Sequence, residues 1–323
     1  MRNLHRLRIV ILVVALLILP SCRRGVEGAF ISAGTFMMDT YVVITIFNPP
    51  PGIEESAIHK AFAYMRTLEE LLSKTMPNSD VYRINTAAAG CAVPVSDATI
   101  EILRFAKDIY ILTDGLFDVT VGAVSALWDF IPGAMPPPHD SISYALQFVG
   151  MGFLELDYTN NTVTKQYCGV RIDLGGIAKG FIADAAYTYL KELGVTAAII
   201  DAGGDIRLIG TRPGTSVWLV GVEGADGEIL RVLPLFGGAA ATSGAHHRAF
   251  VHNGVNYHHI LNPSTGCPHI SDVSLITVTA PTAMMADALS TAVFLLGADA
   301  GQELIDFLSG FEYEIDIFKV KIN

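Results

Sequence analysis

The sequence predicts an α+β fold for this chain of 323 residues. Some segments are runs of β-branched and apolar residues, such as TYVVITIF within residues 34–47, and these are typical of strands. Others repeat apolar residues at steps of three and four, which is typical of amphipathic helices. Because the two kinds of segment do not alternate strictly, the pattern favours α+β over a doubly wound α/β sheet. A hydrophobic content of 51% argues against disorder.

In the first half of the chain we expect one strand and two helices before a proline-rich loop at 132–138. The strand at 34–47 ends at the Asn-Pro-Pro-Pro-Gly run of residues 48–52. The first helix turns these residues inward: Ile58, Phe62, Met65, Leu68, Leu71 and Leu72. The second helix is capped by Ser96, ends near Gly115 and turns four residues inward: Ile100, Leu103, Ile109 and Leu112.

The second half mixes strands, turns and two further long helices. A short helix after the proline-rich loop is followed by two strands joined at residues 160–161. Next come a strand at 170–174, a glycine-rich turn and a helix at 181–193. We then expect strands at 197–200 and 218–222, a turn at 226–227, a hairpin at 253–254 and a buried helix at 282–296.

The N-terminus predicts export and lipid anchoring. Three arginines precede an apolar run at 9–20, which is too short to span a bilayer of roughly 30 Å and is typical of a signal peptide at 1–21. The run ends in Leu-Pro-Ser-Cys, which resembles a bacterial lipobox with Cys22 as the lipidated residue. Residues 22–35 would then tether a domain at 36–323 to the membrane, on the periplasmic or extracytoplasmic face of, we expect, the inner membrane. The alternative is a buried or anchor helix with an unrelated cysteine.

Charge and cysteine content exclude other classes. The net charge of −11, which becomes −14 when residues 1–21 are removed, is opposite to that of a nucleic-acid binder. Cys91, Cys168 and Cys267 have no Cys-x-x-Cys spacing, so we expect no cysteine metal site and at most one disulfide.

Asp287 is the most informative single residue. It is the only charged residue within 283–296, a segment that is apolar on all sides and therefore expected to be buried. A buried carboxylate is costly unless it is paired or binds a cation. Thr291 follows four residues later on the same helical face, and two such oxygen ligands suit Mg²⁺. The alternative is that Asp287 caps a neighbouring turn or pairs with a buried Arg or Lys.

Two glycine turns and a histidine cluster are weaker signals. The turns at 173–180 (DLGGIAKG) and 201–205 (DAGGD) fit either a phosphate site at a helix start or simply a tight corner. Six of the nine histidines lie between residues 246 and 269, but the adjacent pairs would point to opposite strand faces, which disfavours a zinc site. His259 precedes the turn at 262–266, so we expect it at a strand end, where it could act as a general base or an electrostatic donor.

Taken in order, seven segments resemble one family, the ApbE-type FAD:protein FMN transferases. They are MDT at 38–40, GLFDVTVG at 115–122 followed by Leu-Trp at 127–128, DLGGIAKG at 173–180, DAGGD at 201–205, TSG at 242–244, HHI at 258–260 with NPSTG at 262–266, and ADALSTA at 286–292. They span residues 38–297, most of the mature chain. The resemblance implies an ApbE-like, T-fold-related single catalytic unit of mixed sheets and packed helices. It also implies an enzyme that binds FAD and Mg²⁺, releases AMP and attaches FMN to a Thr or Ser hydroxyl of acceptor subunits in membrane redox complexes.

The resemblance also implies roles for individual residues. Metal ligation falls to Asp287, Thr291 and the main-chain carbonyl of Gly176, and His259 would activate the acceptor hydroxyl. The residues implied to line the FAD site are Met38, Leu116, Phe117, Asp118, Asp173, Lys179 and Ile260, together with Thr75.

Two positions depart from the family pattern. Thr75 stands where many members carry an aromatic residue that can stack on the flavin nucleotide, and residues 245–248 (AHHR) replace an acidic and aromatic pair. The first departure keeps one alternative open, a metal-dependent FAD pyrophosphatase that yields FMN and AMP. A further alternative, from a different class, is a lipid-anchored FAD-binding protein without turnover.

Overall fold

The structure is a computed structural model that describes residues 29–245, 248–310 and 315–321. The predicted signal peptide at 1–21, Cys22 and the tether as far as residue 28 lie outside these ranges. Within them, no helix combines the length and the apolar character needed to cross a membrane.

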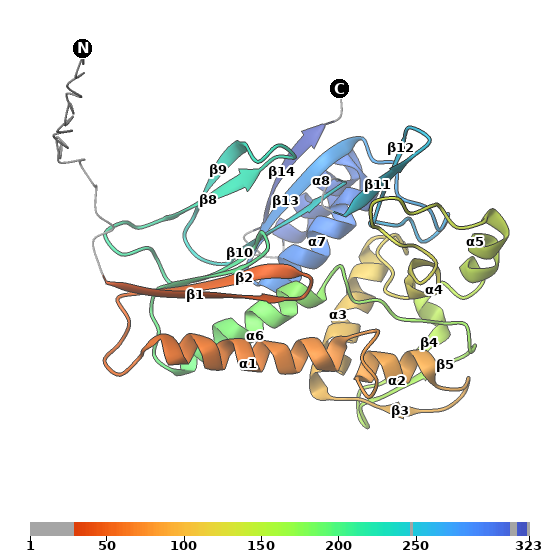
Figure 1. Ribbon diagram of the computed structural model, residues 1–323, viewed down its shortest axis with the longest axis horizontal. Coiled ribbons are helices and arrows are strands. Elements are labelled where there is room, and N and C mark those ends of the chain that lie inside the picture. Colours follow the sequence, from red (N-terminus) through yellow and green to blue (C-terminus); the bar gives the residue numbers. More distant parts are fainter. Residues whose placement is uncertain (1–28, 246–247, 311–314, 322–323) are drawn as a thin grey trace, which may run out of the picture.

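A seven-stranded sheet organises the molecule (Figure 1). All neighbouring strands are antiparallel, and the sheet runs in the order β1-β2-β6-β7-β10-β13-β14. Their bounds are β1 Phe30–Met37, β2 Thr40–Phe47, β6 Ala198–Ala202, β7 Asp205–Ile209, β10 Ala239–Gly244, β13 Val273–Ala280 and β14 Asp316–Lys321. In β2 the alternating residues Val42, Ile44 and Ile46 are fully buried, because one face of the strand points into the core.

Three long helices pack against this sheet. α1 (Glu55–Leu72) contacts β1, α6 (Ala178–Glu192) contacts β6 and β7, and α7 (Ala283–Leu296) contacts β10 and β13. α6 also packs on both α1 and α7, which places it at the centre of the helical layer. The β8–β9 hairpin (Trp218–Glu223 and Ile229–Leu235) forms a separate cluster in which Trp218 packs with Ala197 and Leu208.

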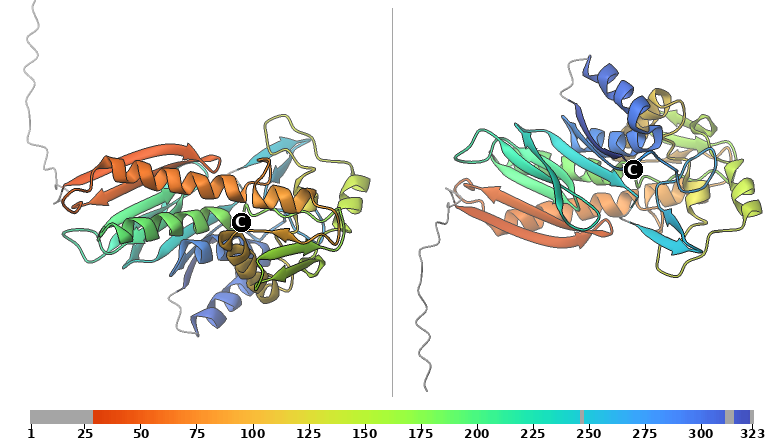
Figure 2. Two further views of the ribbon diagram at one scale, coloured as in Figure 1. Left: turned by 90° about the horizontal axis from the view of Figure 1, so that it is seen from below. Right: turned by 90° about the horizontal axis from the view of Figure 1, so that it is seen from above.

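Most of the remaining elements form the other end of the molecule, whereas α8 packs on α7 and β14 (Figure 2). The helices are α2 Asp80–Thr86, α3 Asp97–Leu112, α4 Gly122–Ser125, α5 His139–Leu146, α8 Ala298–Ser309 and the 3-10 turn η1 Met151–Phe153. β3 (Val93–Pro94), β5 (Thr162–Lys165) and β4 (Leu154–Asp157) make a three-stranded sheet, and β11 (Ala249–His252) pairs with β12 (Val255–His258). The result is the predicted α+β class, with helices on antiparallel sheets.

The structure corrects four sequence-based expectations. Residues 34–47 form two strands, because Met38 and Asp39 both adopt positive φ values, 53° and 57°, and reverse the chain. β1 begins at Phe30, so residues 30–35 belong to the sheet and not to a tether. Leu112 is 38% exposed at the end of α3, although Ile100, Leu103 and Ile109 are buried as predicted. Residues 170–174 form only an isolated bridge between Arg171 and Val121.

Candidate active site

α7 carries the buried carboxylate as predicted. Thr282 caps the helix, since its side chain accepts a hydrogen bond from the Met285 N–H. Asp287 is 3% exposed and accepts from the Gly180 N–H at 3.0 Å and from Lys179 Nζ at 3.4 Å. Asp287 therefore caps the start of α6 and contacts a lysine, which was the alternative to metal binding.

Lys179 joins Asp287 to a second buried carboxylate, Asp205. Its ammonium donates a short hydrogen bond to Asp205 Oδ2, so one cation serves two carboxylates. The pKa of Asp205 is raised to about 7, mainly by burial and further by repulsion from the Asp287 charge. The attraction of Lys179 acts in the opposite direction but does not outweigh burial. Burial opposes the charged form of Lys179, but the two carboxylates outweigh it and raise the pKa of the ammonium. The cluster thus carries an excess negative charge when all three groups are ionised.

Thr291 and Gly176 lie next to each other beside this cluster. A Cβ at Gly176 would be 3.3 Å from Thr291 Oγ1, so a side chain here would force its neighbours to shift by a few tenths of an ångström. Thr291 Oγ1 is 3.2 Å from Ser243 Oγ on β10, which fixes the hydroxyl. Asp287 lies one helical turn before Thr291.

These residues fit Mg²⁺. A carboxylate, a hydroxyl and a main-chain carbonyl are hard oxygen donors, and Mg²⁺ in proteins is commonly held by one or two carboxylates, with phosphate oxygens and water completing its shell. The distance from Asp287 Oδ1 to Lys179 Nζ, 3.4 Å, is long for a hydrogen bond, and Lys179 also donates to Asp205. Asp287 Oδ1 is therefore only weakly held by the lysine. The described part of the chain has no cluster of three or more His, Cys, Asp or Glu side chains suited to a metal.

The turn at 173–176 is fixed by its first residue. Asp173 accepts hydrogen bonds from Lys74 Nζ at 2.6 Å, Ser125 Oγ at 2.6 Å and the Gly175 N–H at 3.0 Å. Burial alone would raise the pKa of Asp173, but Lys74 and these hydrogen bonds outweigh it and lower that pKa. Asp173 is therefore ionised at neutral pH. The exposed Thr75 lies beside Lys74, in the segment that this ion pair joins to the turn.

The segment at 116–118 lines the same turn. A Cβ on Gly176 would be 3.5 Å from Phe117 Cε2, and Leu116 packs on the main core. The buried Asp118 accepts from the Thr120 N–H and Oγ1 at 2.7 and 2.6 Å. Burial raises the pKa of Asp118, although these hydrogen bonds lower it. The Asp118 side chain thus fixes the conformation of its own loop.

A side chain also fixes the turn between β1 and β2. The Met38 N–H in this turn donates a hydrogen bond to Glu69 Oε1 of α1 at 2.5 Å.

His259 directly follows β12, at the strand end that the sequence predicted. It is half-buried and its ring is edge-on to Phe130, with centroids 6.4 Å apart. The adjacent His258 is buried, with Nε2 at 2.9 Å from the His269 carbonyl, so the two histidines have different surroundings as expected. Ile260, 5% exposed, belongs to the main core.

Several residues of this site were not predicted as such. The sequence did not indicate that Lys74 and Ser125 would bond to Asp173, or that Asp205 would pair with Lys179. Ser243 lies in the TSG segment at 242–244, but its contact with Thr291 was not predicted, because the two positions are 48 residues apart. Three cysteines, Cys91, Cys168 and Cys267, are free, so no disulfide links them.

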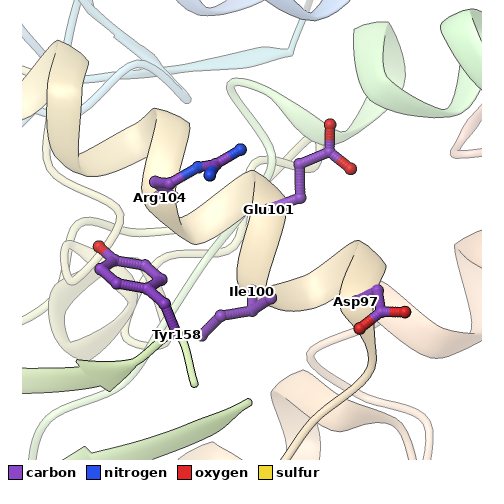
Figure 3. Close-up of a pocket in the computed structure, with 5 residues that line it drawn as sticks. All are labelled: Asp97, Ile100, Glu101, Arg104 and Tyr158. Atoms are coloured by element: carbon purple, nitrogen blue, oxygen red, sulfur yellow. The ribbon is translucent and has the colours of Figure 1, made fainter. Parts of the chain in front are cut away.

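The two cavities lie elsewhere. One of about 230 Å³ is formed by residues of α3 and by Tyr158 (Figure 3). The other, about 610 Å³, lies among α1, α3, α6, β7 and the start of α7 and is lined by Tyr64, Tyr187, Asp184 and Arg207 among others. Neither is lined by a residue that the sequence assigned to the site.

Together, the fold and the site define a class: an α+β protein in which buried carboxylates and a lysine adjoin a glycine turn, with oxygen ligands of the kind that Mg²⁺ takes. Residues 38–314 match the model of the ApbE family, and the chain belongs to that family. A curated relative from Vibrio cholerae, named FAD:protein FMN transferase, is 30% identical over 90% of this chain and 88% of its own length. A relative of the same name from Treponema pallidum is 29% identical over 94% of this chain and 89% of its own.

Solved structures show the same fold. The crystal structure of the ApbE protein from Thermotoga maritima superposes with a TM-score of 0.81 at 31% identity, covering 90% of this chain and 97% of its own. The flavin transferase ApbE from Vibrio cholerae gives 0.79 at 25% identity, covering 91% and 97%.

Proposed function

We propose that this enzyme is an FAD:protein FMN transferase that uses Mg²⁺, releases AMP and joins FMN to a Thr or Ser hydroxyl of an acceptor flavoprotein subunit. The observation that carries the proposal is the group formed by the buried Asp287 with the half-buried Lys179 and Thr291 beside Gly176, in a chain related to such transferases over most of its length. Asp205 and Asp287 share one lysine, which leaves a negative charge that a bound cation would offset, and this supports a ligand site here.

In the proposed reaction the acceptor hydroxyl oxygen forms a bond to the FMN phosphorus of FAD. The bond from that phosphorus to the AMP oxygen breaks, AMP leaves, and the hydroxyl proton passes to His259. Asp287, Thr291 and the Gly176 carbonyl would hold Mg²⁺, which supplies charge neutralisation at the diphosphate when bound. Lys179 adds a fixed positive charge beside it, which an otherwise acidic chain needs in order to bind a dinucleotide.

The location proposed for the enzyme is the outer face of the inner membrane, through acyl chains on Cys22. Its support is the sequence of residues 1–22. This would place the enzyme beside acceptor subunits of membrane redox complexes.

The test is incubation of the protein with FAD, Mg²⁺ and a candidate acceptor subunit. We expect flavin fluorescence on the acceptor that survives denaturation, together with stoichiometric AMP. Asp287→Asn should lower turnover by about 100-fold or more, because it removes the charge that would hold the metal. A melting curve checks that this variant is folded, and tightly bound FAD with no AMP under any metal condition would contradict the proposal.

A second activity has one observation in its favour. Thr75 is exposed and cannot stack on a flavin, which would let water reach the diphosphate in place of the acceptor. In that case the enzyme is a metal-dependent FAD pyrophosphatase, and AMP with free FMN forms without an acceptor. A lipid-anchored FAD-binding protein would instead keep FAD unchanged in both wild type and Asp287→Asn.

A further inference from the structure

Lys74 is a charged residue at the site with no assigned role. It lies in a short segment after α1 that is internally fixed, since Ser73 Oγ accepts from the Thr75 and Met76 N–H groups at 3.2 and 3.1 Å. Ser79 Oγ in turn donates to the Ser73 carbonyl. This turn presents Lys74 to Asp173, which is 99 residues further along the chain.

Asp173 places a negative charge where the proposed function requires an anion to bind. It is the first residue of the turn whose Gly176 touches Thr291, and it is ionised because its bonds to Lys74, Ser125 and Gly175 favour the charged form. An uncompensated carboxylate at this position would repel a diphosphate, because both groups carry negative charge.

Lys74 is placed to cancel that charge. Its ammonium is 2.6 Å from Asp173 Oδ2, and its side chain is 47% exposed whereas that of Asp173 is 18% exposed. Asp173 is largely buried and Lys74 is half exposed, so Lys74 supplies a positive charge to a carboxylate that has lost most of its contact with solvent. It also fixes the segment that carries Thr75 onto the glycine turn.

We propose that Lys74 is a positioning residue for dinucleotide binding: its ion pair with Asp173 neutralises the turn at 173–176 and holds the segment 73–76 against it, so that the turn accepts the diphosphate of FAD. This inference rests on the proposed function, because it concerns the same FAD site. Lys74 would act through Asp173 and would not need to contact FAD itself.

A double-mutant cycle tests it. The dissociation constant for FAD is measured by flavin fluorescence with Mg²⁺ present, for the full chain and for Lys74→Met, Asp173→Asn and the double variant. We expect Lys74→Met to weaken FAD binding about tenfold, since it leaves the carboxylate uncompensated. In the Asp173→Asn background the same change should cost less than about twofold. Lys74→Arg, which keeps the charge, should stay within about threefold of wild type.

Controls separate this effect from others. Lys60→Met removes an exposed lysine of α1 and should leave FAD affinity unchanged. Melting curves of all variants should show one cooperative transition, so that a loss of FAD affinity is not a loss of folding. Unchanged affinity in Lys74→Met, or an equal loss in both backgrounds of the cycle, would overturn the inference. A wild-type protein that fails to bind FAD would instead refute the proposed function itself.

Discussion

Buried charges away from the site are each satisfied by several partners. Lys165 is 1% exposed, and its ammonium donates to the carbonyls of Asn85, Cys168 and Val170. Burial of this charge is costly and lowers the pKa of Lys165. Asp80, 3% exposed, is held by three hydrogen-bonding residues. Asp205 differs, since it shares one lysine with Asp287 and its pKa is raised to about 7. An under-compensated carboxylate pair is what a site that receives a cation requires.

Asp80 allows a stability prediction with a definite pH dependence. Burial would raise its pKa, but bonds from Ser96, Thr99 and Arg83 outweigh burial and lower the pKa below the unfolded value of 3.8. A lowered pKa means that the folded state binds fewer protons than the unfolded state, so the stabilisation is present above pH 3.8 and is lost as the pH falls through the folded value. Asp80→Asn should cost about 2 kcal/mol at pH 7.

Urea unfolding at several pH values checks this prediction. The difference in unfolding free energy between wild type and Asp80→Asn should shrink as the pH falls below 3.8. Asp108→Asn, an exposed change on α3, should alter stability by less than about 0.5 kcal/mol at either pH. A pH-independent difference would show that the lost bonds matter and the charge does not.

At the scale of elements, α6 and α7 cap each other. Asp184 of α6 accepts from the Ala283 and Met284 N–H groups at the start of α7, at 3.0 and 2.8 Å. Asp287 of α7 accepts from the Gly180 N–H in the first turn of α6. Each carboxylate favours the positive end of the partner helix, so the two helices fix each other's position. The proposed metal ligands on α7 are thereby held against the glycine turn before α6.

Gly180 is where this pair of helices depends on the absence of a side chain. A Cβ at Gly180 would be 2.1 Å from the Ala283 carbonyl oxygen, so Gly180→Ala must push the helices apart. We expect a loss of about 3 kcal/mol or more in stability and at least a tenfold loss of transferase activity, because the bond to Asp287 is disturbed. Gly152→Ala is the matched control, since its Cβ meets nothing within 4 Å. Equal behaviour of the two variants in melting and turnover assays would contradict this account.

How much the sequence could predict follows from how local each signal is. The helices α1, α6 and α7 have strong periodicity, so their existence and inner faces were predictable. Residues 170–174 alternate buried apolar residues like a strand, but the Asn85 side chain bonds both the N–H and the carbonyl of Ile172 in place of a neighbouring strand. No local pattern indicates that a side chain 87 residues away takes this role.

The site divides in the same way. The burial of Asp287 was evident from its apolar helix, because that signal lies within fourteen residues. The family resemblance predicted only that Lys179 lines the FAD site. The pairing of Lys179 with Asp205 and Asp287 was not predictable, because it depends on how α6, α7 and β7 pack. Lys74 gave no signal, because its segment reaches Asp173 only through the tertiary fold.

At the scale of the whole molecule, the candidate residues come from two packing units. Asp287, Ile260 and the glycine turn belong to the large core between the sheet and α1, α6 and α7. His259 contacts Phe130, which packs on a second cluster formed by Trp128, Ile142, Phe250 and neighbours. Trp128 Nε1 donates to the Gly266 carbonyl at 3.0 Å and ties the turn after His259 to this second unit. A dinucleotide that contacts both groups would therefore stabilise the entire fold.

Ligand-dependent melting tests this coupling. A ligand that binds only the folded state stabilises it by about 2.7 kcal/mol at 100 times its dissociation constant, which for a chain of this size raises the melting temperature by roughly 4–5 °C. We expect FAD with Mg²⁺ to produce such a shift in a single transition, and FAD alone to produce a smaller one, because the metal offsets diphosphate charge beside Asp287. In Asp287→Asn the increment due to Mg²⁺ should vanish while any shift due to FAD alone persists. If Mg²⁺ raises the melting temperature of that variant as much as that of the wild type, the metal binds elsewhere. Two separate transitions would mean that the two packing units unfold independently and that FAD contacts only one of them.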